Sequence, residues 1–329
     1  MSARIDYIDS LRGIVMLCVV YWHISIYTGT TDSPVNLIYM PFYMTLFFFL
    51  NGFFSHTIIL TLSEGWEKVK KRFFSLLLPT IITGSLWVLY TNRSVESVLF
   101  NEMKGGYWFT FVAFEIYVLY IILKVLLIRI QKSINELYIW CLVILLFSIL
   151  AYIGHQWDNV PFWHLFSGYQ VVKYIPFFIL GVICKINIQR FYALLNMNWV
   201  LSLSLFIMIL FYLYPNKIGT ALQGYLGILL VYTIFARNTI IFGESHWVGR
   251  SLTYIGRHTL PIYFFHYFFL SGLSYMNVIL RPLMVNNAWV ISLIVTLLCA
   301  VIVTICCLIV EKLLRIVPQL YFCLLGPQK

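Results

Sequence analysis

Runs of about twenty apolar residues recur along the whole chain, and this hydropathy pattern constrains the fold more than any other feature. A helix of roughly 20 residues crosses a hydrocarbon core of about 30 Å. The segments between the runs are too apolar or too short to make a soluble domain. Charged residues make up only 10% of the chain, against about 25% in a typical globular domain. The pattern therefore predicts an all-α, polytopic integral membrane protein.

We expect about ten transmembrane helices in a single membrane domain over residues 1–329, without an appended soluble domain. The apolar runs predict spans at 13–31, 36–61, 73–91, 107–128, 137–153, 170–185, 197–214, 219–236, 258–275 and 288–311. The N-terminal segment carries two acids and no small-residue cleavage site, so we expect the first span to stay in the mature protein.

The basic residues predict which side of the membrane the termini face. With a cytoplasmic N-terminus, 17 of the 22 Lys and Arg residues fall in cytoplasmic segments. The five on the outer side are Arg93, Lys104, Lys173, Lys217 and Arg281. Because cytoplasmic loops carry the excess of Lys and Arg, both termini are expected in the cytoplasm. This scatter accounts for the net charge of +10 without a nucleic-acid partner.

Polar groups inside spans are the first candidates for function, because lipid penalises them unless they line a cavity or pathway. Asp9 and Arg12 lie at the opening of the first predicted span, and His23 lies within it. Arg12 and His23 are eleven residues apart, so they share nearly one helix face about 16 Å apart along the axis. Arg12 is either a snorkelling anchor or a site for an anionic donor, and His23 is either a packed histidine or a proton acceptor.

Two further spans carry unexpected polar groups. Asn51 and Gly52 lie between phenylalanines in LFFFLNGFFSH, where they either allow close helix packing or hold a substrate group. Glu115 lies about eight residues into the fourth span, and a carboxylate there requires a cation, a histidine or a polar cavity. Lys173 is one possible partner for Glu115. A structural and a catalytic role for this carboxylate both stay open.

The ninth span begins at Arg257 and His258 in IGRHTLPIYFFHYFF. Thr259, Tyr263 and His266 follow with spacings of four and three, which places them on one helix face. They are either satisfied core groups or part of a site. The seven cysteines show no CxxC or Cys/His spacing, so we expect neither a disulfide framework nor a metal site.

The segment GHQWDNVPFWHLFSGY, at 154–169, forms the most aromatic of the expected outer loops. It contains His155, Trp157 and His164. Aromatic residues at this depth either anchor the loop in the membrane interface or stack against a sugar ring.

Several blocks of the sequence match a known pattern in order and spacing. RIDYIDSLRG is followed by the R-x10-H spacing of Arg12 and His23, and FFFLNGFF is similar to FF-x-x-S-G-F. KKRFFSLLLP carries Arg72 and Pro79, and YWF, KYIPFFILG and IGRHTLPIYFFH follow. Together these blocks resemble the integral-membrane acyltransferase family 3, and within it the fucose 4-O-acetylase and enterobacterial-common-antigen O-acetyltransferase branch.

This chain departs from the family pattern at three positions. Asn51 and Thr259 stand where serine is usual, and Glu115 lies too far beyond Trp108 to match the W-x-L-x-x-E block of longer O-antigen acetylases. The resemblance therefore assigns no role to Glu115.

The resemblance implies transfer of an acyl group, usually acetyl from cytoplasmic acetyl-CoA, to a hydroxyl of a cell-envelope sugar in the bacterial inner membrane. The acceptor is expected to be an envelope glycan or a polyprenol-linked sugar. His23 would take the proton of the attacking hydroxyl or would carry the acetyl group itself. The sequence does not choose between these routes.

These considerations give three groups of candidate residues. The expected catalytic residues are Asp9, Arg12, His23, Tyr263 and His266. The expected binding residues for the donor phosphates are Arg12, Lys71, Arg72 and Arg257. The expected acceptor-binding residues are Asn51, Trp108, Glu115, Trp157, His164 and Lys173. An oxyanion would be stabilised by Tyr263, Asn51 or His266.

Two other classes of function fit the same spans. A transporter or flippase for an envelope lipid or sugar also uses buried His, Glu and Lys residues as proton relays. A structural subunit of a polysaccharide export complex needs the spans alone. Binding of CoA separates the enzyme from both.

Overall fold

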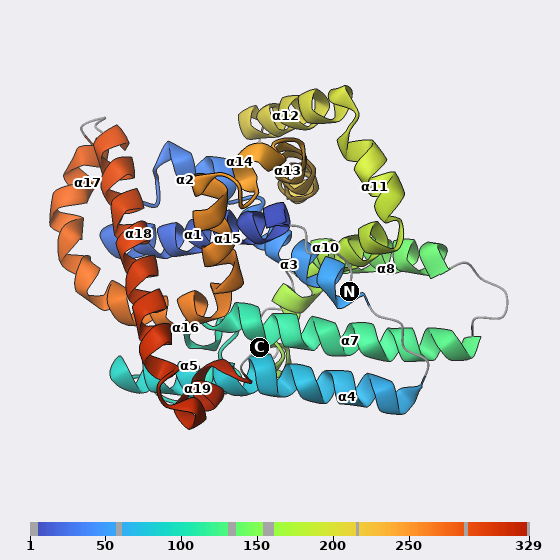
Figure 1. Cartoon of the computed structure of the whole chain (residues 1–329), viewed down its shortest axis with the longest axis horizontal. Coiled ribbons are helices and arrows are strands. Elements are labelled where there is room, and N and C mark those ends of the chain that lie inside the picture. Colours follow the sequence, from blue (N-terminus) through green and yellow to red (C-terminus); the bar gives the residue numbers. More distant parts are fainter. Residues whose placement is uncertain are drawn as a thin grey trace. The chain divides into compact units, whose positions relative to one another are not determined.

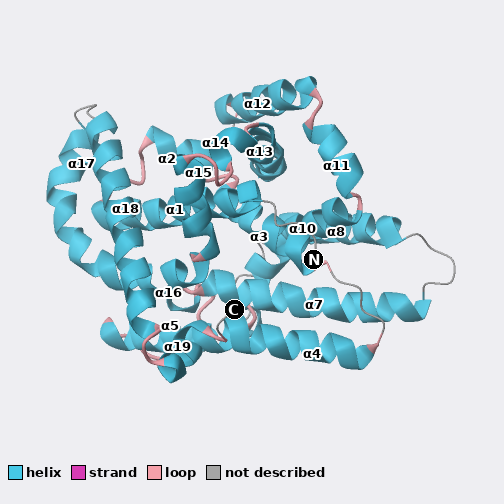
Figure 2. Cartoon of the chain, in the orientation of Figure 1, coloured by secondary structure: helices cyan, strands magenta, loops and turns pink. Residues whose placement is uncertain are grey.

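The computed structural model describes residues 6–56, 61–130, 136–153, 161–214, 217–285 and 289–327. The described residues form helices and connecting turns with no strand among them, as Figure 2 shows. The all-α fold predicted from the hydropathy pattern is confirmed.

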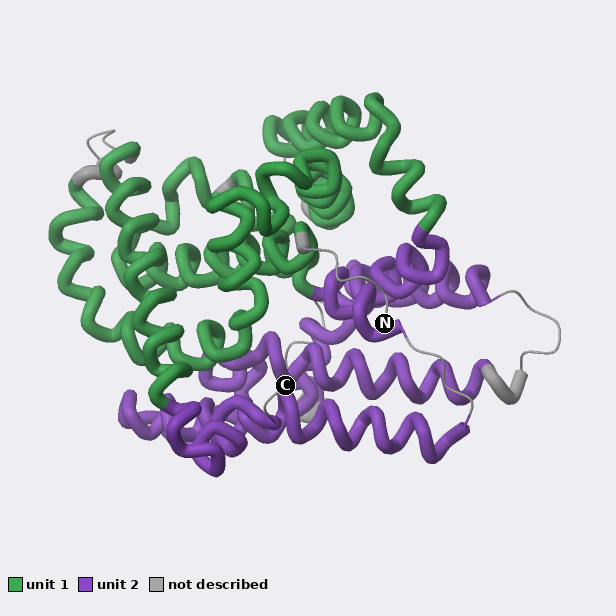
Figure 3. The backbone as a smooth tube through the Cα atoms, in the orientation of Figure 1, with its two compact units in different colours: residues 1–47, 189–313 green, residues 48–188, 314–329 purple. Residues whose placement is uncertain are grey.

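The chain divides into two compact units, shown in different colours in Figure 3. Unit 1 comprises residues 1–47 and 189–313, and unit 2 comprises residues 48–188 and 314–329. The helices of unit 1 are α1 (Asp6–Thr28), α2 (Pro34–Tyr39), the start of α3 (Tyr43–Ser55), α11 (Ile188–Leu195), α12 (Asn198–Leu213), α13 (Lys217–Arg237), α14 (Thr239–Phe242), α15 (Trp247–Arg257), α16 (Thr259–Leu270), the 3₁₀ segment η4 (Ser271–Met276), α17 (Asn277–Val285) and α18 (Trp289–Leu314).

Unit 2 contains the rest of α3 and the helices between it and α11, together with the last helix of the chain (Figure 1). These are α4 (Leu62–Arg72), the π-helix η1 (Phe73–Leu77), α5 (Leu78–Tyr90), α6 (Glu96–Phe100), the 3₁₀ turn η2 (Lys104–Gly106), α7 (Trp108–Ile130), α8 (Glu136–Ile153), α9 (Pro161–Leu165), α10 (Gly168–Ile186) and α19 (Pro318–Leu325).

The described helices support several membrane crossings. Six are long and apolar enough to span a bilayer: Tyr7–Thr28, Leu62–Tyr90, Trp108–Leu127, Glu136–Ile153, Gly168–Ile186 and Val290–Leu314. The pair α11 and α12 passes the same test but bends by 74°. Helices lie in all ten predicted regions, but four of those regions hold a short or bent helix. The side on which the termini lie stays a prediction.

The helix in the predicted third span begins before the apolar run, because it starts at a capping box. Thr61 Oγ1 accepts from the backbone N–H of Glu64, and the Glu64 carboxylate accepts from the backbone N–H of Thr61, each at 3.2 Å. Further along, the Leu78 N–H donates to Phe73 O in a π-turn. The wider turn precedes Pro79, whose ring clashes with the carbonyl four residues earlier in a regular α-helix.

In unit 1, α1 packs more extensively against α15 than against any other described helix. Two glycines make this crossing possible. A Cβ on Gly13 would lie 2.1 Å from Leu252 O, and a Cβ on Gly256 would lie 1.8 Å from Asp9 O. Both distances are far below any real contact, so the two backbones touch at this point. The crossing brings the first turns of α1 to the end of α15.

Unit 2 has a similar crossing between α3 and α10. A Cβ on Gly52 would lie 1.8 Å from Phe178 O, and a Cβ on Gly181 would lie 2.0 Å from Phe49 O. Of the two interpretations of the Asn51–Gly52 pair, close helix packing is therefore confirmed for Gly52.

Candidate active site

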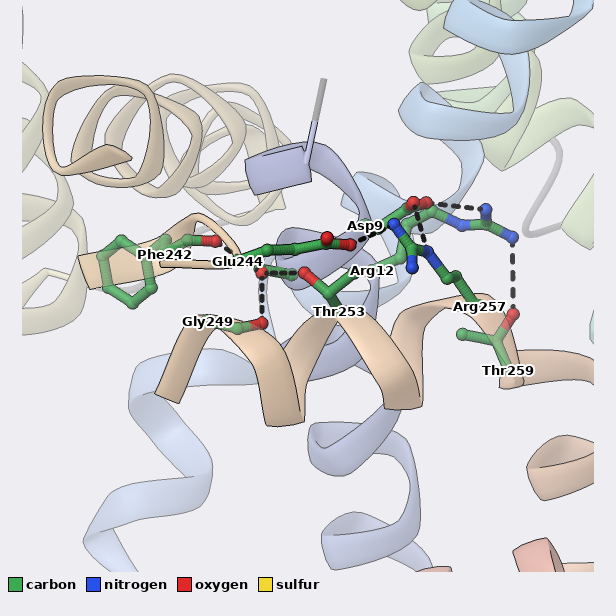
Figure 4. A network of polar contacts seen from close by, with 9 residues as sticks. Asp9, Arg12, Phe242, Glu244, Gly249, Thr253, Arg257 and Thr259 are labelled. Carbon is green, nitrogen blue, oxygen red and sulfur yellow. Dashed lines mark hydrogen bonds and ion pairs between the residues drawn. The ribbon is translucent and has the colours of Figure 1, made fainter. Parts of the chain in front are cut away.

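The start of α1 carries a carboxylate between two guanidinium groups, all within unit 1. The Asp9 carboxylate lies 3.6 Å from Arg12 Nη1 and 3.3 Å from Arg257 Nε (Figure 4). The Asp9 side chain is only 7% exposed, whereas those of Arg12 and Arg257 are 33% and 34% exposed. Both arginines are thus anchored on a buried acid while part of each guanidinium stays accessible.

Two more contacts fix the directions of these arginines. Arg257 pairs with Glu244, and Arg12 Nη2 donates to Thr259 Oγ1 at 3.4 Å. Partial burial lowers the pKa of Arg257, but the carboxylates of Asp9 and Glu244 outweigh this effect and raise that pKa above its ordinary value. We call Asp9, Arg12 and Arg257 the arginine end of α1, and its two guanidinium groups stay protonated because arginine is not deprotonated in proteins.

Ser10 ties this end of α1 to the neighbouring helices. Its Oγ lies 2.6 Å from Phe242 O, 3.1 Å from Gly249 O and 2.8 Å from Thr253 Oγ1. Ser10 is fully buried. Its hydroxyl holds α1 against both α14 and α15, so it supports the position of the arginines.

A second polar cluster lies eleven residues further along α1. His23 Nδ1 lies 3.2 Å from His266 Nε2 and 2.9 Å from Val19 O, and His23 Nε2 lies 2.8 Å from the Tyr267 hydroxyl. His266 is fully buried and Tyr267 is 7% exposed. We call His23, His266 and Tyr267 the histidine cluster.

The contacts of the histidine cluster define where its protons are. His266 Nδ1 faces two carbonyl oxygens, those of Ile262 at 3.1 Å and Tyr263 at 2.7 Å, so this nitrogen carries the hydrogen. In the neutral ring, His266 Nε2 is then an acceptor. His23 Nδ1 faces that acceptor and Val19 O, so it also carries a hydrogen. The free lone pair of neutral His23 is therefore on Nε2, where the Tyr267 hydroxyl donates to it.

Tyr267 is a residue that the helix-face argument missed. It follows His266 directly and lies four residues after Tyr263, so it borders the stripe of Thr259, Tyr263 and His266. The expected Tyr263 is buried with its ring 5.9 Å from that of His266. The sequence signal that could have identified Tyr267 is a hydroxyl-bearing residue next to a histidine in an otherwise apolar helix.

In unit 2, Arg72 meets Asn51. Arg72 Nη2 donates to Asn51 Oδ1 at 3.0 Å, and its guanidinium lies 5.3 Å from the centre of the Tyr117 ring. Arg72 is the last residue before the π-helix, a feature that is frequent at functional sites. Lys71 is exposed on the same helix. The structure brings Asn51 and Arg72 together, and both belong to a different unit from the clusters on α1.

An aromatic stack in unit 2 contains Trp108. The Tyr174 ring stacks on Phe48 at 4.5 Å and on Trp108 at 5.6 Å between ring centres. Lys173 Nζ lies 5.3 Å from the centre of the Tyr174 ring. The expected acceptor residues Trp108 and Lys173 are therefore neighbours through Tyr174.

Lys173, the possible partner proposed for Glu115 from the sequence, is not the cation whose charge acts on Glu115. The cation whose charge acts on Glu115 is Lys104, whereas the charge acting on Lys173 is that of Glu102. Both carboxylate oxygens of Glu115 are buried without a hydrogen-bond partner among the described residues. Helical periodicity could not predict that the charge of Lys104 acts on Glu115, because Lys104 lies in the η2 turn that precedes α7.

Lys104 joins the η2 turn to α6 and α9 in unit 2. Its Nζ donates to Leu99 O, His164 O and Leu165 O at 2.6, 2.8 and 2.7 Å. Burial lowers the pKa of Lys104 to about 8, although the charges of Glu115 and Glu102 act in the opposite direction.

His164 contacts the same region through its side chain as well, with its Nδ1 at 4.0 Å from a Glu102 carboxylate oxygen. Trp157 lies outside the described residues.

Comparison with protein families identifies the chain. A family profile described as an acyltransferase domain matches residues 5–311. The chain belongs to acyltransferase family 3. No curated protein and no solved structure matches it. The resemblance drawn from the sequence blocks is thereby confirmed at the level of the family.

This family 3 acyltransferase is a multi-pass membrane protein in which α1 contributes to two polar clusters. Asp9, Arg12 and Arg257 meet at one point, and His23 meets His266 at another. Sequence reasoning missed Glu244, which completes the first group, and Tyr267, which completes the second.

Proposed function

We propose that this acyltransferase moves an acetyl group from cytoplasmic acetyl-CoA to a hydroxyl of a cell-envelope sugar in the bacterial inner membrane. The observation that carries the proposal is the order of hydrogen bonds in the histidine cluster. This order leaves the basic lone pair of His23 on Nε2, next to the Tyr267 hydroxyl that donates a hydrogen bond to it. An acyl transfer to a hydroxyl needs such a base, because a neutral hydroxyl is a poor nucleophile.

His266 acts in this proposal as the orienting partner of His23. Its Nδ1–H is held by two backbone carbonyls, so its Nε2 accepts from His23 and fixes the ring. This differs from our expectation that His266 itself donates to an oxyanion. Tyr263 remains a candidate donor for that charge.

The arginine end of α1 suits the phosphates of the donor. Guanidinium forks match phosphate oxygens, and the side chains of Arg12 and Arg257 are partly accessible while buried Asp9 orients both. Lys71 and Arg72, which belong to unit 2, stay proposed candidates for binding an anionic group. Acetyl-CoA would supply a thioester, whose carbonyl carbon is the electrophile.

The chemical step is written from His23. The acceptor hydroxyl oxygen forms a bond to the acetyl carbon while His23 Nε2 takes the hydroxyl proton. The carbon–sulfur bond then breaks, its electron pair stays on sulfur, and the imidazolium returns the proton to the thiolate. In the acyl-histidine route, His23 Nε2 first forms the bond to the acetyl carbon, and the carbon–sulfur bond breaks with its electron pair on sulfur. The sugar hydroxyl oxygen then forms a bond to the same carbon, the carbon–nitrogen bond breaks with its electron pair on Nε2, and the hydroxyl proton passes to the thiolate. Both routes require Tyr267 to leave Nε2.

The acceptor side is proposed to involve unit 2. Trp108 offers an aromatic face, Lys173 a cation and Glu115 a buried carboxylate without a hydrogen-bond partner among the described residues. Sugars are bound by combinations of aromatic stacking and hydrogen bonds to hydroxyls. His164, Asn51 and Trp157 are further candidates for this role.

The test is transfer of labelled acetyl from acetyl-CoA to envelope glycan by purified protein in lipid vesicles. Wild type is compared with His23→Ala and with His246→Asn, which alters a histidine that caps α15 but keeps a side-chain acceptor. Label in the glycan that is lost in His23→Ala and kept in His246→Asn supports the proposal. Full activity of His23→Ala would contradict it.

The transporter alternative is tested in the same vesicles. A flippase would move the glycan lipid without CoA, and its activity would not depend on the thioester. Movement of the lipid without CoA and without acetyl transfer would replace the proposed reaction.

A further inference from the structure

The break between α15 and α16 carries three consecutive residues that contact three different elements of unit 1. Arg257 pairs with Asp9 on α1 and with Glu244. Thr259 accepts from Arg12 on α1. His258, between them, contacts Glu311 on α18, with 2.6 Å between Nδ1 and a carboxylate oxygen.

Glu311 lies in a buried position, where a carboxylate requires an ion-pair or hydrogen-bond partner. It is only 3% exposed and lies near the end of the most apolar of the candidate spans. A buried carboxylate is costly unless it is paired and hydrogen-bonded. The short distance to His258 is typical of a charge-assisted hydrogen bond. The pair is therefore a strong point of attachment between α18 and the break.

The backbone conformation of His258 links its contact with Glu311 to the positions of Arg257 and Thr259. His258 ends α15 and precedes α16, with φ −113° and ψ 25°, outside the helical range. Its ring also packs against that of Tyr254, 4.5 Å away between centres. Fixing the side chain of the bend residue fixes the backbone on either side of it. The directions of Arg257 and Thr259 then follow.

We propose that Glu311 is a positioning residue for the donor-phosphate site. Through His258, it sets the bend between α15 and α16, and through that bend it sets the two arginines that face the donor. This inference rests on the proposed function. It assigns Glu311 a role in donor affinity, because preorganised cations lose less freedom when an anion binds.

The experiment measures steady-state acetyl transfer in vesicles with acetyl-CoA as the varied substrate. We expect Glu311→Gln to raise the KM for acetyl-CoA about threefold and Glu311→Ala about tenfold, with kcat within about twofold of wild type. Glu311→Asp keeps the charge and should restore most of the affinity. The KM for the acceptor should not change in any of these variants.

Thr304→Val is the matched control on α18. Thr304 is buried two turns from Glu311, and its hydroxyl donates to Ala300 O of its own helix at 2.7 Å. This variant removes a buried polar group without touching the bend, so its KM for acetyl-CoA should equal that of wild type.

The outcomes separate this inference from the proposed function. Wild-type protein without acetyl-CoA-dependent transfer would overturn both. Active Glu311→Gln and Glu311→Asp proteins with a wild-type KM for acetyl-CoA would overturn the role of Glu311 alone. A loss of kcat and of folded protein in the same proportion, with KM unchanged, would make Glu311 a residue of stability and would also overturn it.

Discussion

The two polar clusters on α1 differ in charge and in access to water. At the arginine end, one buried acid holds two half-buried guanidinium groups by ion pairs. In the histidine cluster, two imidazoles and a phenol are joined by hydrogen bonds between neutral groups. Ion pairs near water hold and orient a charged ligand. Groups that are buried away from water exchange protons with little reorganisation of the surrounding dipoles. In the proposed function, α1 thus contributes separately to donor binding and to chemistry.

The largest effect is expected from His23→Ala, which removes the base but leaves the arginine end intact. We expect kcat to fall by about 10³-fold, within the range for general bases, with the Kd for CoA unchanged. Binding of CoA is measured by calorimetry and kcat by label transfer. Loss of CoA binding in this variant would mean that the two clusters act as one site.

Tyr267→Phe should have the next largest effect. It removes the hydroxyl that donates to His23 Nε2, and we expect kcat to fall about tenfold because the base loses its orientation and its proton-exchange partner. Tyr263→Phe is the comparison on the same helix, and its effect should be smaller. Equal losses in the two variants would extend the histidine cluster to Tyr263.

Arg257→Ala should act on the other cluster and change binding instead of chemistry. We expect the KM for acetyl-CoA to rise about tenfold with kcat within about twofold, because a phosphate loses one partly accessible cation. Salt sharpens the comparison, since it screens exposed charges. Raising the ionic strength should raise the KM of wild type more than that of Arg257→Ala. A fall in kcat alone would contradict this division.

The smallest effect is expected from Ser10→Ala. The variant loses a buried hydrogen bond between helices, which is worth about 1 kcal/mol. Thermal unfolding in detergent should show a Tm a few degrees lower, with unchanged kinetics. Ser25→Ala is the control, because buried Ser25 bonds only within α1 in the contacts described, to Tyr21 O at 3.1 Å. An equal shift in both variants would show that Ser10 does not join the helices.

Much of the fold follows from sequence, because apolar length and periodicity are local properties. A helix lies in each of the ten predicted regions, six of the described helices are long and apolar enough to span a bilayer, and α10 contains both Lys173 and Pro176. Sequence alone did not predict the start of α4 at its capping box or the π-turn before Pro79. Hydropathy measures which residues prefer lipid, and a helix that extends beyond the lipid leaves no apolar signal.

The candidate site was predictable only within one helix. The shared face of Arg12 and His23 follows from spacing, and so does that of Tyr263 and His266. Which residue meets which across two helices depends on their crossing, which Gly13 and Gly256 determine. For that reason Tyr267 escaped prediction. Lys104 was not foreseen as the charge partner of Glu115 because turns carry no helical period.

The unbroken course of α1 between Arg12 and His23 has a consequence for donor choice. The helix works as a ruler, since each residue adds about 1.5 Å and about 100° of rotation. A donor whose anionic group and thioester are separated by a much shorter arm would reach only one of the two residues. The enzyme would then select acyl donors by the length of the carrier between the anionic group and the thioester. The number of residues between Arg12 and His23 on α1 would set the length that fits.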